Sequence, residues 1–258
     1  MKLIEDIPLM KATRRAFRDS DGTVVLVPTM GYLHEGHRTL LKRGRRPGAS
    51  LVMSVFVNPA QFGPGEDFKA YPRDLKRDIM TAEEEGVDIV FAPRAADMYP
   101  NGYDTYVSVE GLSKNLCGIG RPGHFRGAAT VVLKLFNIVE PHTAVFGKKD
   151  FQQLSVIKRM VKDLDLDIGI EEVETVRDAN GLALSSRNAC LTPEERSAAN
   201  CIPASLNAGK LAFLSGARES VDVIRRMKNI MDSEPRAVIE YLKICDPATL
   251  ADIDRIGK

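Results

Sequence analysis

An apolar run that stops at a proline, and is followed by a glycine loop and two histidines, constrains this chain more than any other feature. The run Val24–Val27 meets Pro28, the loop contains Gly31, and His34 and His37 stand where a helix should begin. A strand, a loop and a helix N-terminus in this order present backbone N–H groups to phosphate. The spacing of three puts both imidazoles on one face of the first helical turn. Imidazole donates hydrogen bonds to phosphate oxygens and adds positive charge when protonated, so the stretch predicts a site for a nucleotide triphosphate.

Zinc is the alternative ligand for the same two histidines. The metalloprotease helix spaces its histidines four apart and places a glutamate directly after the first, without an intervening glycine. Here Gly36 comes directly before His37, and no Cys or Asp completes a cluster nearby. The sequence therefore favours phosphate over zinc.

Strand-like and helix-like segments alternate through the first two thirds of the chain. Strands are predicted over Thr23–Pro28, Leu51–Val57, Val87–Phe91 and Thr143–Phe146. Helices are predicted over Gly36–Arg46, Leu75–Glu85 (ending at Gly86), Ala128–Val139 and Phe151–Asp163. This order predicts an α/β fold with a doubly wound parallel sheet, in which ligands bind at the carboxyl ends of the strands. The loops after Val27, Val57 and Phe146 should converge there.

The alternation of strand-like and helix-like segments ends at about Val176. Thr192 followed by Pro193 and two glutamates is typical of a helix start. A further helix is expected over Ile224–Met231 and a strand over Ala237–Cys245. We therefore expect a large domain over 1–175 and a smaller α+β domain over 176–258, with the loop 181–188 near their junction.

Composition excludes several classes of partner. The chain has 36 basic and 35 acidic residues, so no charge excess favours nucleic acid or a membrane surface. The N-terminus carries acids and a proline where a signal peptide needs an apolar core. Four scattered cysteines without a CxxC pair indicate free or buried thiols of a cytoplasmic protein. They are Cys117, Cys190, Cys201 and Cys245.

Five stretches together resemble the pantothenate synthetase (pantoate–β-alanine ligase) family, in the family's order and over almost the whole chain. The tetrapeptide His34–His37 is similar to the HxGH motif of the wider nucleotidyltransferase superfamily, which includes class I aminoacyl-tRNA synthetases. The five stretches are Pro28–His37, Phe56–Phe62, Arg121–Gly127, Phe146–Gln153 and Gly181–Asn188. The resemblance implies a Rossmann-like nucleotidyltransferase fold.

The resemblance also implies a reaction, in which ATP activates pantoate as a pantoyl-adenylate. The amine of β-alanine then forms the amide of pantothenate, a coenzyme A precursor, with release of AMP and pyrophosphate. Mg²⁺ should accompany the ATP, because it screens the polyphosphate. The family is commonly dimeric, so a homodimer built on the large domain is expected, with small-molecule substrates and neither nucleic acid nor membrane as a partner.

Site residues carry over position by position. His34, His37, Lys149 and Arg187 are expected to be catalytic, with His37 donating a proton or stabilising charge. The residues expected at ATP are Met30, Gly31, His34, His37, Gly147, Lys148, Lys149, Asp150, Val176, Leu184, Ser185, Ser186 and Arg187. Gln61 and Gln153 are expected to bind pantoate or β-alanine, beside an apolar wall of Pro28, Met30 and Phe62. Tyr71–Asp74 and Arg121–Gly127 resemble family sequence without an assigned role.

Two departures and two alternatives accompany this interpretation. At Lys148 the family more often has Glu or Gln. Family members also usually continue well past the segment that resembles Tyr241–Lys258, and from this second departure we expect a truncated chain or a reduced small domain. One alternative is another adenylyltransferase, which would act on a phosphate ester. The other is a nucleotide-binding module without turnover. An aminoacyl-tRNA synthetase is disfavoured, because neither an anticodon-binding domain nor a basic surface is evident.

Overall fold

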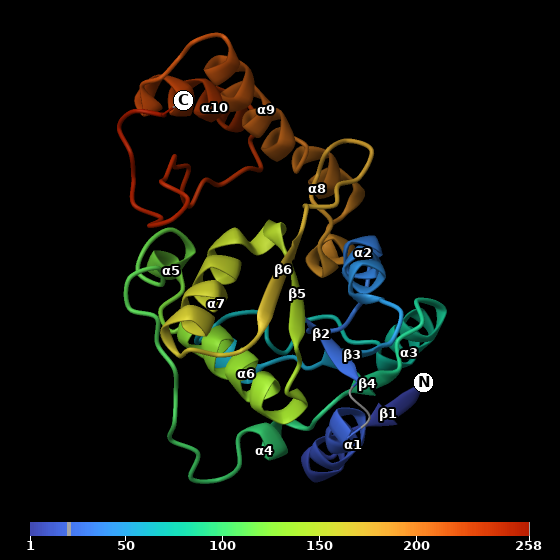
Figure 1. Ribbon diagram of the computed structural model, residues 1–258. Coiled ribbons are helices and arrows are strands. Elements are labelled where there is room, and N and C mark those ends of the chain that lie inside the picture. Colours follow the sequence, from blue (N-terminus) through green and yellow to red (C-terminus); the bar gives the residue numbers. More distant parts are fainter. Residues whose placement is uncertain (20–21, 258) are drawn as a thin grey trace.

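A parallel sheet organises the molecule. The structure is a computed structural model that describes residues 1–19 and 22–257. The described residues form a six-stranded sheet in the order β1-β4-β3-β2-β5-β6, with all neighbouring strands parallel (Figure 1). The strands are β1 (Lys2–Ile4), β2 (Thr23–Thr29), β3 (Ala49–Val55), β4 (Ile89–Phe91), β5 (Thr143–Gly147) and β6 (Gly169–Val173).

Helices cover both faces of this sheet. The helices of the sheet domain are α1 (Ile7–Asp19), α2 (Glu35–Gly44), α3 (Leu75–Glu84), α4 (Ala95–Met98), α5 (Cys117–Gly120), α6 (His124–Val139) and α7 (Phe151–Asp163), with 3-10 turns η1 (Pro59–Gln61) and η2 (Lys148–Asp150). Val24 and Leu26 of β2 pack with α1, α6 and α7, whereas Val25 and Val27 pack with α2 and α3. This alternation along one buried strand is the pattern of a sheet covered on both sides. The predicted doubly wound α/β fold is confirmed.

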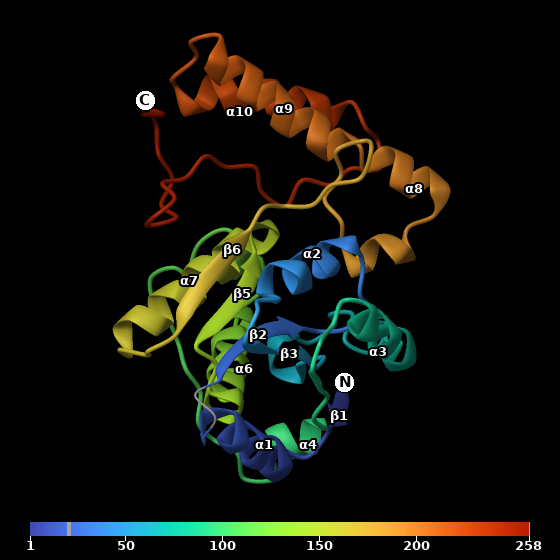
Figure 2. The same ribbon diagram turned by 45° about the vertical axis from the view of Figure 1, so that its right-hand side comes forward.

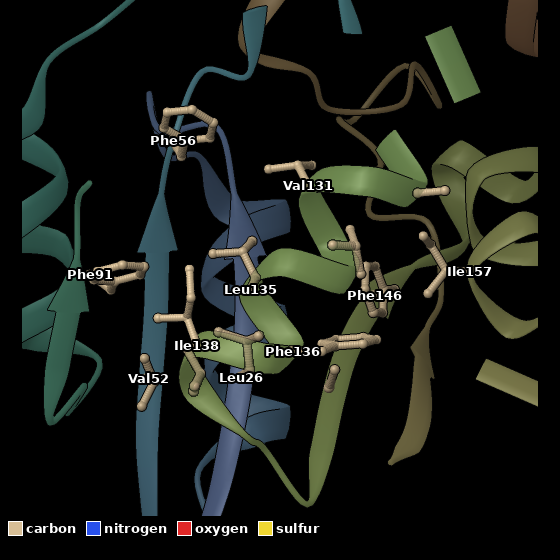
Figure 3. Close-up of a cluster of buried hydrophobic side chains, with 14 of the residues drawn as sticks. Leu26, Val52, Phe56, Phe91, Val131, Leu135, Phe136, Ile138, Phe146 and Ile157 are labelled. Atoms are coloured by element: carbon tan, nitrogen blue, oxygen red, sulfur yellow. The ribbon is translucent and has the colours of Figure 1, made fainter. Parts of the chain in front are cut away.

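Helix α6 supplies much of the larger apolar cluster. Val131, Leu135 and Ile138 are spaced four and three apart, and Figure 3 shows Leu135 and Ile138 directed at the sheet near Leu26 and Val52, and Val131 toward Phe56. Side chains at this spacing share one helical face. Burial of that face fixes α6 against the sheet, so its N-terminal half is a rigid wall near the carboxyl ends of the strands.

The strand order places the ligand crevice. From β2 the chain moves outward through β3 and β4, and then returns through α6 to β5 on the other side of β2. β2 and β5 therefore lie at a topological switch point, where the loops that follow the two strands diverge and leave a crevice. The segment 30–34 leads into the histidine motif, which begins at His34 and continues into α2, and the segment 148–150 is the Lys-Lys-Asp sequence.

A helical region follows the sheet. It contains η3 (Ser186–Cys190), α8 (Pro193–Ala198), α9 (Cys201–Leu214) and α10 (Ser220–Asp232), and Figure 2 shows α9 and α10 side by side, away from the sheet. Gly209 permits this contact, because a Cβ there would lie 2.6 Å from Sδ of Met227. The predicted cap at Thr192 is confirmed, since its side chain accepts from the backbone N–H of Glu195.

The strand predicted over Ala237–Cys245 is wrong. In the described part of this region the only pairings are isolated bridges, such as Cys245 with Asp252, and Val238 is 87% exposed. A short apolar segment becomes a strand only when a neighbour satisfies its backbone groups along its length, and here the described residues supply a single bridge, Cys245 with Asp252, at its end.

Other boundaries differ by a few residues. The predicted helix Gly36–Arg46 is α2, which ends at Gly44, and the helix predicted from Ala128 begins at His124. β1, α1, β6 and α9 were not predicted. Within residues 1–19 and 22–257, no helix has the length and apolar character needed to cross a membrane.

Candidate active site

The loop after β2 is shaped by a buried carboxylate on α3. Asp78 Oδ2 accepts from the backbone N–H of Tyr32 at 2.8 Å, and Oδ1 accepts from that of Leu33 at 2.7 Å. Gly31 has φ +79°, and a Cβ there would lie 2.7 Å from Asp78 Oδ2. Asp78 is 1% exposed, and burial raises the pKa of its carboxyl above the ordinary value. The loop conformation therefore depends on both Gly31 and Asp78.

The two histidines cap α2 with their Nδ1 atoms. His34 is the N-cap residue, and its Nδ1 accepts from the N–H of Gly36 at 3.1 Å. His37 Nδ1 accepts from the N–H of His34 at 3.2 Å, and the ring centroids lie 4.1 Å apart. A backbone N–H can only donate, so each Nδ1 is unprotonated and each Nε2 carries the hydrogen. Capping therefore uses Nδ1 of each ring and leaves Nε2–H as the remaining donor.

Both imidazoles are neutral at neutral pH in the free protein. Burial, and then the nearby Lys149, lowers the pKa of His34 to about 4. Burial, followed by His34 and Lys149, lowers the pKa of His37 to about 3. The pair consequently offers two neutral Nε2–H donors rather than the positive charge that the sequence suggested.

Two cavities meet at these histidines. The first encloses about 130 Å³ and the second about 190 Å³. Seven residues line both: Pro28, His34, His37, Phe146, Lys149, Asp150 and Gln153. The first cavity continues under Gly147, Val176 and Leu184, and the second continues past Met30, Gln61, Ser185, Ser186 and Arg187. Most of the residues predicted from sequence therefore line one connected cleft.

Two predicted ATP residues do not line either cavity. Gly31 acts through the loop conformation described above. The ammonium group of Lys148 pairs with Glu174, which lines the first cavity, and lies 3.8 Å from Glu172, so two carboxylates engage it. This placement agrees with the departure from the family pattern at Lys148.

The Ser185–Arg187 segment reaches the cleft from the helical region. Ser186 Oγ donates to the carbonyl of Tyr32 at 3.1 Å, which ties this segment to the histidine loop. Arg187 makes a two-bond ion pair with Asp67, from Nε at 2.7 Å and from a terminal nitrogen at 2.9 Å. The pair lowers the pKa of Asp67. The guanidinium is thus held at the rim of the second cavity by a carboxylate.

Comparison with known proteins places the chain. The family model described as pantoate-beta-alanine ligase matches residues 2–257. The chain belongs to the pantoate-beta-alanine ligase family.

Relatives of known name are similar over nearly their whole length. Pantothenate synthetase of Geotalea uraniireducens is 53% identical over 256 residues, which are 99% of this chain and 90% of the relative. The crystal structure of pantothenate synthetase from Thermus thermophilus superposes with a TM-score of 0.94 at 43% identity, covering 100% of this chain and 91% of that one. A Francisella tularensis pantoate-beta-alanine ligase, complexed with beta-gamma ATP and beta-alanine, gives a TM-score of 0.80 at 33% identity over 90% of this chain and 86% of that one.

The apolar lining of the second cavity includes two of the three residues predicted for the wall, and other residues besides. Phe62 does not line the second cavity, because its ring packs against Phe68 and Tyr71, with centroids 5.2 Å and 6.0 Å away. The wall is formed instead by one face of α6, through Val131, Val132 and Leu135. Pro28 and Met30 contribute as expected.

Among the residues that line the second cavity without a role assigned from sequence, three lie in the segments Tyr71–Asp74 and Arg121–Gly127, which resemble the family. They are Tyr71, Arg121 and His124. Arg121 pairs with Glu66, with Nε 3.0 Å from Oε1, and its guanidinium lies 3.2 Å from His124 Nε2. His124 Nδ1 lies 2.8 Å from the carbonyl oxygen of Gln61. Both segments stood in the stretches that resemble the family, and that was the signal available for them.

Proposed function

We propose that this chain condenses pantoate with β-alanine to pantothenate, using ATP and passing through a pantoyl-adenylate, with release of AMP and pyrophosphate. One observation carries the site assignment. Two cavities share His34, His37 and Lys149, so a nucleotide in one cavity and an acid in the other would bring the α-phosphate and the carboxylate together at these residues. Adenylation requires this juxtaposition.

The first cavity suits the nucleoside. It passes beneath Val176 and Leu184, and Asp150 lines it with a carboxylate that can accept from ribose hydroxyls. Gly36 forms part of the same wall. An adenosine in this cavity would have its phosphates beside the histidines.

The second cavity suits pantoate. The α6 wall of Val131, Val132 and Leu135 can cover its geminal methyl groups. Gln61 and Gln153 line the same space and supply amide groups for its hydroxyls and carboxylate. Apolar and polar surfaces thus match the two halves of this acid.

In the first step a carboxylate oxygen of pantoate attacks the α-phosphorus and pyrophosphate leaves. Negative charge grows on the phosphate oxygens, where the Nε2–H groups of His34 and His37 and the ammonium of Lys149 are placed to receive it. Donors fixed in advance at developing charge supply a large part of such catalysis. Ser185, Ser186 and Arg187 would meet the leaving pyrophosphate at the cavity rim.

In the second step the free amine of β-alanine attacks the acyl carbon of the adenylate. The C–N bond forms, the bond from the acyl carbon to the phosphate oxygen breaks, AMP leaves with that oxygen, and the nitrogen gives up one proton to water. Pantoate must stay in place between the two steps, and the glutamines and the α6 wall are suited to hold it.

Mg²⁺ fits this scheme as a companion of the nucleotide. In residues 1–19 and 22–257, no group of three His, Cys, Asp or Glu side chains could hold a metal. The ion would be held mainly by polyphosphate oxygens and water, with Asp150 as a cleft carboxylate within the lining. Bound there, Mg²⁺ would neutralise phosphate charge.

Release of AMP in the presence of ATP, pantoate and β-alanine tests this function, together with exchange of labelled pyrophosphate into ATP when β-alanine is left out. AMP formation and exchange that both depend on pantoate would support the two-step ligase. Exchange that depends on a phosphate ester would instead identify another adenylyltransferase. ATP binding without either reaction would identify a nucleotide-binding module.

We also propose a large domain over 1–175 and a small domain over 176–258, in a cytoplasmic homodimer built on the large domain. A separate apolar cluster of Ala212, Val223 and Met227 supports the division, and free thiols in all four cysteines are consistent with the cytoplasm. Sedimentation at micromolar concentration tests the dimer, and a monomer would refute it.

A further inference from the structure

The Gln61 side chain at the second cavity is held by a buried asparagine. Gln61 is 7% exposed, and its Oε1 accepts from Nδ2 of Asn58 at 2.9 Å. Asn58 is fully buried at the N-cap of η1, three positions beyond the end of β3. Gln61 therefore meets the cavity in an orientation that Asn58 controls.

Backbone groups define which end of the Asn58 amide is which. Its Nδ2 also donates to the carbonyl of Gly127 at 3.1 Å, and its Oδ1 accepts from the N–H of Ala60 at 3.2 Å. A carbonyl cannot donate and a backbone N–H cannot accept, so a flipped amide would face two like groups. Gly127 makes the close approach possible, because a Cβ there would lie 2.0 Å from the carbonyl oxygen of Ala60.

Tyr99 makes the fourth hydrogen bond to the Asn58 side chain. Its hydroxyl donates to Asn58 Oδ1 at 2.8 Å, although Tyr99 itself does not line the cleft. Its ring is held by Phe56 and Tyr103, at centroid distances of 6.3 Å and 5.0 Å. Burial raises the pKa of Tyr99, so the hydroxyl keeps its proton and remains a donor.

These contacts of Asn58 determine which end of the Gln61 amide faces the cavity. With Oε1 committed to Asn58, the part of the amide available to a ligand is Nε2, with its N–H groups. Such a group binds oxygen acceptors, a carboxylate or a hydroxyl lone pair, and rejects a ligand donor at the same place.

We propose that Tyr99 is a positioning residue which, by holding Asn58, keeps the Gln61 amide turned so that it selects an oxygen acceptor on the acid substrate. This inference rests on the proposed function, since it assigns the acid to the second cavity. Tyr99 lines neither cavity, and its effect passes through Asn58 and Gln61.

Steady-state kinetics of Tyr99→Phe test the proposal. Loss of one buried hydrogen bond should raise KM for pantoate roughly two- to tenfold, with kcat and KM for ATP nearly unchanged. Tyr103→Phe is the matched control, because it removes a neighbouring hydroxyl and should leave all three constants unchanged. An unchanged pantoate KM in Tyr99→Phe, or an equal rise in KM for ATP, would overturn the proposal.

A double-mutant cycle separates positioning from a general structural effect. In a Gln61→Ala background, Tyr99→Phe should add nothing further to the pantoate KM, because its target is already gone. A further rise in the pantoate KM as large as in the parent chain would contradict an effect of Tyr99 through Asn58 and Gln61. Asn58→Asp should weaken pantoate binding more than Tyr99→Phe does, since it replaces the Nδ2 donor by an acceptor.

A ligand-free measurement keeps this inference separable from the proposed function. In ¹⁵N spectra of the protein without substrates, Tyr99→Phe should shift the side-chain amide signals of Asn58 and Gln61, and Tyr103→Phe should not. If the signals shift but the protein never forms AMP from pantoate, the proposed function is refuted and the positioning of Gln61 by Tyr99 and Asn58 is retained. Unshifted signals would refute the positioning of Gln61 by Tyr99 and Asn58.

Discussion

A Cβ atom on Gly36 would lie 2.8 Å from Cε1 and 2.9 Å from Nδ1 of His34, so the imidazole fills the space that any larger residue at this position needs. The third residue of the His-Glu-Gly-His motif is therefore glycine because the first residue folds over the helix N-terminus. We predict that Gly36→Ala displaces His34 and lowers turnover about a hundredfold, the cost of roughly an ångström of misplacement.

Stability should change little in the same variant. Loss of the His34 cap costs about 1 kcal/mol, while alanine in place of glycine within a helix recovers roughly 0.5–1 kcal/mol. Thermal unfolding and turnover measured together check this separation. Gly111→Ala is the control, since nothing lies within 4 Å of its added Cβ. Normal turnover in Gly36→Ala would show that the ring has another place to go.

His37→Ala should lower turnover by about two to four decades, because it removes a placed donor at the developing phosphate charge. It also removes the acceptor for the N–H of His34, at a cost of about 1 kcal/mol, so the variant should still fold. Single-turnover kinetics and thermal unfolding measure the two effects. Lys42→Ala, on the exposed far end of α2, is the control. Near-normal turnover would leave His37 with its capping role alone.

Acid should destabilise the protein through the histidine pair. The folded pKa values of about 4 and 3 lie below the ordinary 6.5, so the unfolded chain binds more protons in between. The stability that these groups contribute is complete above pH 6.5 and is lost as the pH falls toward those values. The double variant His34→Gln, His37→Gln should therefore lose less stability between about pH 7 and 4 than the parent chain, as measured by chemical denaturation. Parallel losses would contradict the depressed pKa values.

The neighbouring glutamines on α7 should separate binding from stability. Gln153→Ala should weaken pantoate binding about tenfold while ATP affinity hardly moves, because Gln153 lines the cleft where the acid is placed. Gln152→Ala should instead lower the free energy of unfolding by about 1–3 kcal/mol. Its amide is buried and bonds to Leu112, Asn115 and Cys117. Calorimetric titration measures the two affinities, and denaturant unfolding measures the stability of both variants. If Gln153→Ala changes ATP affinity more than pantoate affinity, Gln153 binds the nucleotide instead of the acid.

Asp67 should compete with pyrophosphate for Arg187. The pair is partly exposed, so Asp67→Asn is expected to tighten pyrophosphate binding only about two- to fivefold, measured as product inhibition. Asp97→Asn, which breaks the surface pair with Arg94, should leave it unchanged. Weaker inhibition in Asp67→Asn would mean that the carboxylate orients Arg187 for its ligand instead of withholding it.

Local signals predicted much of the fold. The helix Phe151–Asp163 has the predicted bounds, and the cap at Thr192 lies where its sequence pattern indicated. Strand β2 was recognised because an apolar run bounded by Pro28 is strong local evidence. The segment Ala237–Cys245 failed because strand formation depends on a partner, which is not a local property.

The site was predictable only in part for the same reason. The histidines, Lys149 and the two glutamines stand in motifs, and the structure brings them to one cleft. The orientation of Gln61 depends on Asn58, Gly127 and Tyr99, which meet only in three dimensions. No spacing in the sequence expresses that contact.

The contact between Asp78 and the N–H groups of Tyr32 and Leu33 limits how far the histidine motif can be transplanted. The motif is contiguous, but the carboxylate that fixes its loop lies on α3, more than forty positions further along the chain. Grafting Pro28–His37 onto another strand-loop-helix would carry over the imidazoles without the acid beneath them. A transplanted histidine loop would have to include α3 with Asp78, so the unit that keeps the loop in its conformation runs from β2 through α3 rather than over the ten-residue signature.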